Sequence, residues 1–319
     1  MSEASHPVER PAVILDCDPG HDDAIAIVVA AHLCDLVGIT TVAGNAPLDR
    51  TTHNARVMRE LLGIDVAVHA GAARPLLAEP SAAVDVHGLT GLDGAALPEP
   101  VRPVDSEDAA AFIVESCRHR PGTWIVAVGP LTNIALALRR APDVAGSVAG
   151  ISVMGGGTFG NRSAVGEFNV WADPEAAAIV FSSGAPLIMA GLDVTHQFLA
   201  TPERIERVRA IGGRLATTLS ELLTFFSGSY RSRHDEIAGA PMHDVLAVLA
   251  VVEPTLFERR RRHVAIETTG LLTRGMTVID ERTVRSRPAG NCDVLSTVDG
   301  DEAFDRVVGA IARFSVTDR

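Results

Sequence analysis

The stretch Asp16-Cys17-Asp18-Pro19-Gly20-His21-Asp22-Asp23 decides the fold of this chain. It follows an apolar run at 12–15 that has the composition of a buried strand, and it precedes an apolar run at 24–31 that is typical of a buried helix. Four carboxylates therefore crowd one turn between a strand and a helix. Carboxylates this close raise one another's pKa and repel unless a cation lies between them. A hard divalent metal with oxygen ligands meets that need, so the turn is predicted to be a functional site and not only a helix cap.

The composition narrows the class of protein. The chain has 319 residues, of which 47% are hydrophobic, and this suits one large α/β domain or two smaller ones. The net charge of −12 argues against a nucleic-acid partner. No apolar run reaches the roughly eighteen residues of a membrane span, so no membrane partner is expected. The polar segment 1–10 is expected to be a frayed tail ahead of a single domain at 11–319.

Two residue types add further limits. The four cysteines are scattered and form no CxxC pair, which fits a reducing, cytoplasmic location. The chain contains no lysine, and all 28 basic residues are arginine. Schiff-base chemistry and the Walker-type phosphate loop both require lysine, so both are excluded.

Strand-like and helix-like segments alternate along the chain. The strand-like runs lie at 11–15, 36–42, 123–128, 147–153 and 186–190, and the helix-like stretches at 22–33, 49–62, 106–119, 131–140 and 173–182. This alternation predicts an α/β fold with a mostly parallel, Rossmann-like open sheet and helices on both faces. The segment 201–252 is predicted to be mostly helical and near the active site. The segment 262–298 is predicted to add short strands, including a hairpin, before a final helix at 301–314; the run 259–262 is interpreted as a solvated face ahead of a strand.

Polar residues gather in the turns that follow the predicted strands. They include Asn45, the long loop 70–104 with His87, the Gly-rich stretch 155–169 and, late in the chain, His243-Asp244. Open α/β sheets bind ligands beyond the carboxyl ends of their strands, and long loops in compact domains are usually functional or disordered. Carboxylates and amides bind sugar hydroxyls well, so this inventory suits a metal together with a polyhydroxylated ligand.

Several sequence blocks occur together and in a characteristic order. They are the opening Asp-rich stretch, Thr41-Val42-Ala43-Gly44-Asn45, His87-Gly88-Leu89-Thr90-Gly91-Leu92-Asp93-Gly94, Val128-Gly129-Pro130-Leu131-Thr132-Asn133, Met154-Gly155-Gly156, Glu167-Phe168-Asn169-Val170, Asp173-Pro174-Glu175-Ala176-Ala177 and His243-Asp244. This ordered set resembles the nucleoside hydrolases of the inosine-uridine preferring type and covers about residues 11 to 315.

The resemblance implies a calcium site and a reaction. Asp18, Asp23, Asp244 and the backbone carbonyl of Val128 match the ligands of a Ca²⁺ ion, which prefers hard oxygen donors. Asp18 also matches the general base that deprotonates a metal-bound water, and His243 matches the candidate acid for the leaving base. The implied reaction is hydrolysis of the N-glycosidic bond of uridine, inosine or cytidine. The resemblance also implies a homodimer or homotetramer.

The remaining matches concern the nucleoside itself. Residues matching those that grip the ribose, approach the nucleobase or otherwise bind substrate are Asp22, Asn45, His87, Met154, Asn161, Glu167, Phe168 and Asn169. Phe225, Phe226 and Tyr230 have helical spacing, and which of them faces the pocket stays open. A histidine at position 243 resembles the branches of the family that accept pyrimidines, so uridine and inosine are both expected as substrates, with pyrimidines slightly favoured.

Two other functions are compatible with parts of this pattern. A non-enzymatic ribose- or nucleoside-binding protein would explain the amides and acids, but not so dense a metal cluster beside a histidine. A metal-dependent phosphohydrolase of the aspartyl-nucleophile type would explain Asp16 and Asp18 after a strand. Such enzymes typically also use a lysine, which this chain lacks.

Overall fold

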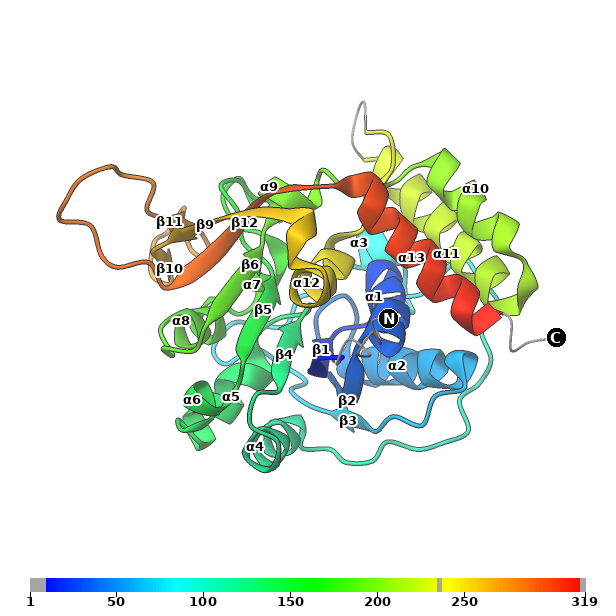
Figure 1. Ribbon diagram of the computed structural model, residues 1–319, viewed down its shortest axis with the longest axis horizontal. Coiled ribbons are helices and arrows are strands. Elements are labelled where there is room, and N and C mark those ends of the chain that lie inside the picture. The colour runs from blue at the N-terminus through cyan, green and yellow to red at the C-terminus, as the bar shows by residue number, and fades with distance from the viewer. Residues whose placement is uncertain (1–9, 234–236, 316–319) are drawn as a thin grey trace, which may run out of the picture.

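Within residues 10–233 and 237–315, which the computed structural model describes, one eight-stranded sheet runs through the molecule (Figure 1). Its order is β3 (Val68–Ala70), β2 (Asp35–Thr41), β1 (Ala12–Cys17), β4 (Trp124–Ala127), β5 (Gly150–Met154), β6 (Leu187–Ala190), β12 (Cys292–Val298) and β9 (Phe257–Arg262). All neighbouring pairs in this sheet are parallel except β12 with β9. The prediction of a mostly parallel α/β sheet is confirmed. Nearly all of the tail expected at 1–10 lies outside the described residues.

The strand order reverses beside β1. The chain steps from β1 through β2 to β3 on one side, and from β4 through β5 to β6 on the other. A parallel sheet has a crevice at such a reversal, outside the carboxyl ends of the two central strands. The turn that follows β1 carries the carboxylates at 18–23, and the turn that follows β4 begins at Val128, so both turns open into this crevice.

Helices cover both faces of the sheet (Figure 1). One apolar core joins the sheet to α1 (His21–Leu33), α2 (Leu48–Leu62), α11 (Gly213–Arg231), α12 (His243–Val252) and α13 (Gly300–Ser315), with α10 (Pro202–Ile211) packed outside α11 and α13. A second core joins it to α4 (Ala109–His119), α5 (Thr132–Arg140), α6 (Val144–Ser147) and α8 (Pro174–Phe181). Short elements between them are α3 (Val84–His87), α7 (Phe168–Ala172), α9 (Leu192–Thr195), β7 (Leu199–Ala200), β8 (Ala240–Pro241) and the 3₁₀ turn η1 (Pro254–Leu256). Helices on both faces and a helical segment near the site are therefore confirmed.

The burial of α1 explains its apolar sequence. Its residues 21–30 are all buried, because the helix packs against the sheet and is surrounded by the helices α11, α12 and α13. A helix covered all round is apolar all round and shows no amphipathic stripe. It has 13 residues, and neither α1 nor any other helix in the described ranges is long and apolar enough to cross a membrane.

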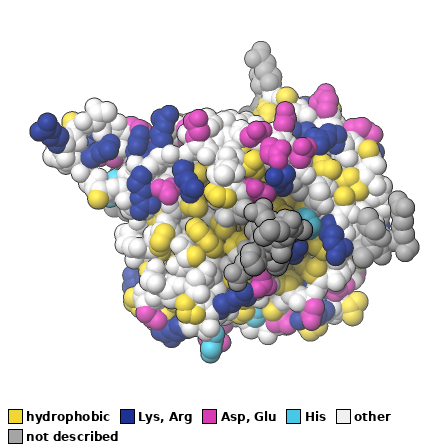
Figure 2. Space-filling model, viewed as in Figure 1, with side chains coloured by type: hydrophobic (Ala, Val, Ile, Leu, Met, Phe, Trp, Pro, Cys, Tyr) yellow, Lys and Arg dark blue, Asp and Glu magenta, His cyan; other side chains and the backbone are white. Residues whose placement is uncertain are grey.

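The C-terminal strands only partly follow the prediction. β10 (Val264–Ile266) and β11 (Thr277–Ile279) form the expected hairpin. The third predicted strand is not part of a separate addition, because β12 pairs with β6 inside the central sheet. The interpretation of 259–262 as a solvated face ahead of a strand was half wrong: these arginines are mostly exposed, but they lie within the edge strand β9. Figure 2 shows arginine side chains gathered at the end of the molecule where β9 and the projecting loop between β11 and β12 lie. The charge on β9 protects this sheet edge from further pairing.

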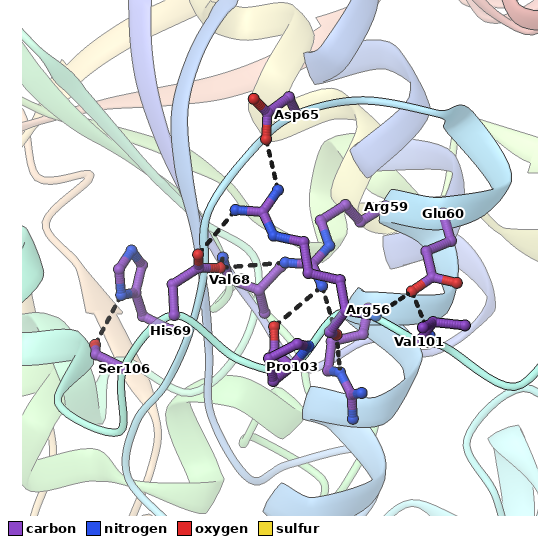
Figure 3. A network of polar contacts seen from close by, with 11 residues as sticks. Arg56, Arg59, Glu60, Asp65, Val68, His69, Val101, Pro103 and Ser106 are labelled. Atoms are coloured by element: carbon purple, nitrogen blue, oxygen red, sulfur yellow. Dashed lines mark hydrogen bonds and ion pairs between the residues drawn. The ribbon is translucent and has the colours of Figure 1, made fainter.

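A buried arginine holds the long loop after β3 against α2 (Figure 3). The Arg59 guanidinium, 1% exposed, donates to the carbonyls of Arg102 at 2.7 Å and Pro103 at 3.1 Å, and its Nη1 lies 3.2 Å from Asp105 Oδ2. Asp105 Oδ2 in turn accepts a hydrogen bond from the backbone N–H of Val68 in β3. The far end of the loop is therefore tied to both a helix and a strand, which leaves its N-terminal part to reach the crevice.

Candidate active site

Three carboxylates meet at the floor of the crevice. Asp22 and Asp23 lie in the first turn of α1, and Asp244 lies in the first turn of α12. One oxygen from each side chain lies within 4.8 Å of the others, and all three residues are buried. Helix N-termini favour negative charge, which explains why the two helices present their carboxylates at this end.

Asp18 lies directly beside this group and is fully buried. Its Oδ2 accepts a hydrogen bond of 2.6 Å from the backbone N–H of Asn45, while its Oδ1 has no hydrogen-bond partner among the described residues. A β-carbon at Gly129 would lie 2.6 Å from that Oδ1. The glycine in the turn after β4 is therefore needed to leave room for the Asp18 carboxylate.

Hydrogen bonds join Asn45, in the turn after β2, to the turn after β1 and the start of α1. Asp23 accepts hydrogen bonds from the N–H groups of Asp18 at 3.2 Å and Gly20 at 2.8 Å, and from the amide of Asn45 at 3.0 Å. The same amide nitrogen donates to the carbonyl of Asp18 at 3.1 Å. Asn45 lines the pocket, but its amide nitrogen is already used to hold the carboxylate cluster.

The four carboxylates are buried without a compensating cationic side chain among the described residues. Burial raises the pKa of each one, to about 8 for Asp22 and well above the usual range for Asp18 and Asp244. Repulsion from a neighbouring carboxylate raises the pKa further for those three. Within residues 10–233 and 237–315, no arginine forms an ion pair with the cluster. A buried, all-oxygen donor set with an unpartnered Asp18 oxygen fits a hard divalent cation.

Val128 also lines the pocket, and its carbonyl accepts a hydrogen bond of 2.8 Å from the Asn169 amide. The same amide donates to the carbonyl of Met154 at 3.2 Å. Glu167 caps α7: its carboxylate accepts from the N–H groups of Asn169 and Val170 at 3.0 and 3.1 Å, and from Gly156 at 3.0 Å. Burial raises the pKa of Glu167, while the three backbone donors oppose that rise and fix the orientation of the carboxylate. These contacts place one further carboxylate and one amide at the pocket wall.

The opposite wall is built from histidines and aromatic rings. His243 Nδ1 lies 2.8 Å from Thr195 Oγ1, and its Nε2 lies 3.3 Å from the Tyr230 hydroxyl. Burial lowers the pKa of His243 to about 3 and raises that of Tyr230 well above its usual range, so both groups are uncharged at neutral pH. Of the three aromatic residues left open by the sequence, Phe226 and Tyr230 line the pocket, whereas Phe225 does not and is 36% exposed.

His87 lies on the same wall and is supported by a residue that the sequence did not single out. Its Nδ1 is 3.1 Å from His21 Nδ1, and His21 Nε2 lies 2.8 Å from the carbonyl of Asp93. The His21 ring also stacks between Phe225 and Phe226. Burial lowers the pKa of His87 well below its usual value, so His87 is also neutral.

Two arginines at the pocket mouth were also missed. Arg233 pairs with Asp85 at 2.6 Å, and the Arg162 guanidinium lies 5.0 Å from the ring centre of Trp171. Arginine on an exposed loop carries no sequence signal that separates it from ordinary surface charge, and only the fold brings these two to the pocket.

One pocket collects most of the residues predicted from the sequence. Those that line it are Asp22, Asn45, His87, Val128, Met154, Asn161, Glu167, Phe168, Asn169, His243 and Asp244. Asp18 and Asp23 lie beneath its floor and are fully buried. Chemically, the pocket offers carboxylates for a cation and for hydroxyl groups on its floor, and neutral hydrogen-bonding rings on one wall.

Comparisons with known proteins agree on one family. Residues 13–305 match the model of the inosine-uridine preferring nucleoside hydrolases. The chain is 42% identical over 310 residues to a pyrimidine-specific ribonucleoside hydrolase RihA of Enterobacter sp. (strain 638), covering 95% of this chain and 98% of that protein. It superposes with a TM-score of 0.90 on a purine-preferring ribonucleoside hydrolase from Gardnerella vaginalis at 32% identity, and with 0.88 on the plant nucleoside hydrolase PpNRh1 at 30%. Both superpositions cover 95% of this chain and 99% of the other.

Proposed function

Since the chain belongs to the family of inosine-uridine preferring nucleoside hydrolases, we propose that its acidic pocket uses a calcium ion and that pyrimidine nucleosides are its better substrates. The protein is a ribonucleoside hydrolase, an enzyme that cleaves N-glycosyl bonds. The observation that carries the proposal is the buried carboxylate cluster, which has no cationic side chain among the described residues to balance it and lies at the floor of the pocket.

Asp18, Asp23, Asp244 and the carbonyl of Val128 would hold the cation. Asp22 contributes to the same group of oxygens. Carboxylate and carbonyl donors without sulfur or imidazole ligands favour Ca²⁺ over softer metals. When bound, the cation would lower the pKa of a coordinated water and bind ribose hydroxyls.

Asp18 acts as the general base. Its Oδ1 has no hydrogen-bond partner among the described residues, so it is free to take a proton, while the bond from Asn45 fixes the carboxylate through Oδ2. The water oxygen forms a bond to C1′ as the bond from C1′ to the base nitrogen breaks. The released proton goes to Asp18, and the electron pair of the broken bond leaves with the base.

The other residues of the pocket bind the ribose and the nucleobase. Met154 and Phe168 pack beside the ribose. Five polar side chains of the pocket orient it: Asp22, Asn45, Asn161, Glu167 and Asn169. The carboxylates among them stabilise the positive charge that develops on the ribose ring in the transition state. His87 contacts the nucleobase.

His243 and Tyr230 serve the leaving base as a pair. With a pKa of about 3, His243 stores no extra proton at neutral pH, so the sequence-based expectation of a simple acid needs refinement. We assign to the pair the role of hydrogen-bond donors that stabilise negative charge as it develops on the departing base. The Tyr230 hydroxyl and the His243 ring both line the pocket and lie in contact.

Pyrimidine preference is supported by the 42% identical relative, which is named as pyrimidine-specific. The pocket lining also contains neither tryptophan of the chain, so it offers no indole ring to stack on a larger purine. The purine-preferring structural relative, at 32% identity, represents the competing outcome, and the ratio of rates on uridine and inosine decides between them.

The test is release of ribose from uridine and inosine by the purified enzyme, before and after removal of calcium with a chelator and its restoration. We expect activity that disappears on chelation, returns with Ca²⁺ and falls about a hundredfold to ten-thousandfold in Asp18→Asn. The asparagine keeps an acceptor for the Asn45 N–H, so the variant removes the base and preserves that bond. Full activity in the chelated enzyme would refute the calcium proposal, and full activity in Asp18→Asn would refute the role of the base.

Two further proposals concern the whole chain. We propose a homodimer or homotetramer, which light scattering after size-exclusion chromatography measures directly. We also propose a cytoplasmic location, supported by four cysteines that are all free and buried. Fractionation of the source cells tests that location.

A further inference from the structure

The sequence block 87–94 closes on itself through a residue of α1. The block begins with His87, which ends α3 and lines the pocket. Near its other end, the carbonyl of Asp93 lies 2.8 Å from His21 Nε2. The backbone N–H of His21 donates to His87 Nδ1 at 3.3 Å, and the ring Nδ1 of His21 lies 3.1 Å from the same atom. Both ends of the block therefore meet on one side chain of α1.

The turn inside this block is held by its own hydrogen bonds. The Asp93 carboxylate accepts from the N–H groups of Leu89 at 3.0 Å and Thr90 at 3.1 Å, and from the Thr90 hydroxyl. Gly88 opens the turn with a φ of 79°, a left-handed conformation that glycine adopts without steric cost. The carbonyl that meets His21 therefore has a fixed position.

His21 is held both by packing and by this carbonyl. Its ring stacks on Phe225 and on Phe226, in each case with ring centres 5.3 Å apart, and it has no exposed surface. Since a carbonyl can only accept a hydrogen bond, His21 Nε2 carries the proton that the Asp93 carbonyl receives. The His21 ring therefore cannot turn without losing that bond.

The rings of His21 and His87 meet edge to edge. Their planes differ by 20°, their centres are 5.3 Å apart and their Nδ1 atoms are 3.1 Å apart. Such a short contact between nitrogens, with the centres so far apart, requires the two rings to lie side by side and nearly in one plane. His21 thus holds the Nδ1 edge of His87. The Nε2 of His87 has no hydrogen-bond partner within residues 10–233 and 237–315, so it is left for a ligand of the pocket.

We propose that His21 is a positioning residue that orients His87 toward the nucleobase, with the turn of the block 87–94 as its anchor. His21 is fully buried and does not line the pocket, so it acts on a substrate only through a neighbour. Burying an imidazole between phenyl rings costs free energy unless its polar atoms are bonded, and its ring is bonded to Asp93 and His87. The proposal rests on the proposed function, in which His87 contacts the nucleobase.

The experiment measures uridine hydrolysis and inhibition by ribose in the full-length enzyme with Ca²⁺. His21→Phe keeps a ring in the same place and removes both polar contacts of the imidazole, so kcat/KM for uridine should fall about tenfold as His87 loses its orientation. The inhibition constant of ribose should change by less than about twofold, because ribose binds away from this contact. His21→Asn restores a polar group beside His87 and should recover part of the loss. His32→Phe, the same substitution in the last turn of α1, should leave both values unchanged.

A double-mutant cycle with His87→Ala separates positioning from a general effect on the fold. If His21 acts through His87, each substitution at position 21 should have no further effect on kcat/KM in the His87→Ala background. Both variants at position 21 enter the cycle, so His21→Asn decides the outcome if His21→Phe fails to fold. Losses that multiply, a ribose inhibition constant that rises in step with the loss, or full activity in His21→Phe or His87→Ala overturns this inference alone. A wild-type enzyme that does not hydrolyse uridine overturns the proposed function instead.

Discussion

The position of Tyr230 on helix α11 determines that its side chain faces the pocket. Phe226 and Tyr230 lie four positions apart on α11 and therefore share a face, which is the face that meets the pocket. Phe225 lies one position away and points toward His21 and solvent. The sequence predicts the helix and the aromatic spacing. It cannot predict which face turns inward, because that depends on helices and loops far away in the chain.

The pair of Tyr230 and His243 leads to a prediction that separates chemistry from packing. Tyr230→Phe keeps the ring and removes only the hydroxyl. We expect kcat/KM for uridine to fall about tenfold, the effect of one lost hydrogen bond to a charge that develops in the transition state. Hydrolysis of 4-nitrophenyl riboside should change by less than about twofold, because its leaving group departs as a stable anion without a donor.

A matched variant on the same helix is Thr217→Ala, whose hydroxyl bonds the carbonyl of Gly213 on the exposed side. It should leave both substrates unaffected. If Tyr230→Phe slowed both substrates equally, the hydroxyl would support the shape of the pocket and would have no role toward the leaving group.

Carboxylates are the residues that the sequence predicts best. Four of them in eight positions between apolar runs form a local signal. His21 and Thr195 were missed because their roles arise only from distant contacts: His21 bonds Asp93, which is 72 positions away, and Thr195 bonds His243, which is 48 positions away. The predicted ribose and base residues came from the family resemblance, and the pocket brings them together.

At the scale of single elements, the N-terminus of α1 depends on a glycine. A β-carbon at Gly20 would lie 2.6 Å from His87 Nδ1 and 2.9 Å from the Asn45 amide nitrogen. Gly20→Ala should therefore displace both side chains, and we expect KM for uridine to rise and kcat to fall, each by about threefold to tenfold. Steady-state kinetics together with a thermal melt would measure the effect. Gly228→Ala on α11, where the added carbon meets open space, should leave the kinetics unchanged; equal kinetics for Gly20→Ala would mean that His87 and Asn45 tolerate displacement.

Helix α2 depends on its buried arginine. Arg59→Met removes the donors to the carbonyls of Arg102 and Pro103 and the partner of Asp105 (Figure 3). Because these acceptors lose their partners in a partly buried place, we expect a loss of about 2 to 3 kcal/mol in the free energy of unfolding. Urea unfolding followed by circular dichroism measures it.

The comparison variant is Arg50→Met, on the same helix. Its pair with Asp49 is 3.9 Å long and more than half exposed, so the expected change is below about 0.5 kcal/mol. Similar losses for the two variants would mean that the bonds around Arg59 contribute no more than a surface contact.

Among the strands, those at and near the C-terminal edge of the sheet are the least predictable from the sequence. Apolar runs predict the central strands, because a parallel strand covered on both faces is apolar throughout. β9 lies at an edge and carries four consecutive arginines, so its sequence resembles a solvated segment. β12 was predicted as a strand, but its place beside β6 depends on long-range pairing that hydrophobic patterning does not specify.

At the scale of the whole molecule, the fold concentrates negative charge that the described part of the chain does not balance by itself. The strand reversal beside β1 brings the turns after β1 and β4 together, and α12 adds a carboxylate from far along the chain. A site built this way is least favourable when all its carboxylates are ionised and no cation is present. Binding of the cation should therefore contribute to the stability of the entire domain.

This charge cluster predicts a pH dependence of stability without calcium. Burial raises the pKa of Asp22 from its ordinary 3.8 to about 8, so in that range the folded protein holds a proton that the unfolded chain has released. The free energy of unfolding must then fall as the pH rises through the range. Histidines whose folded pKa is lowered contribute nothing above about pH 7, because they are neutral in both states there. The Tm of the chelated protein should therefore be lower at about pH 8.5 than at about pH 7.

Added Ca²⁺ should raise the Tm at both pH values, and more at the higher one, where protons no longer compete for the carboxylates. Differential scanning calorimetry with and without chelator measures the four values. Asp22→Asn removes one of the titrating groups and should flatten the slope in the chelated state, whereas Asp49→Asn, an exposed acid on α2, should preserve it. A chelated protein whose Tm rises between these pH values would show that the carboxylates are already ionised and balanced by other groups, and the pocket would then have no need of a cation.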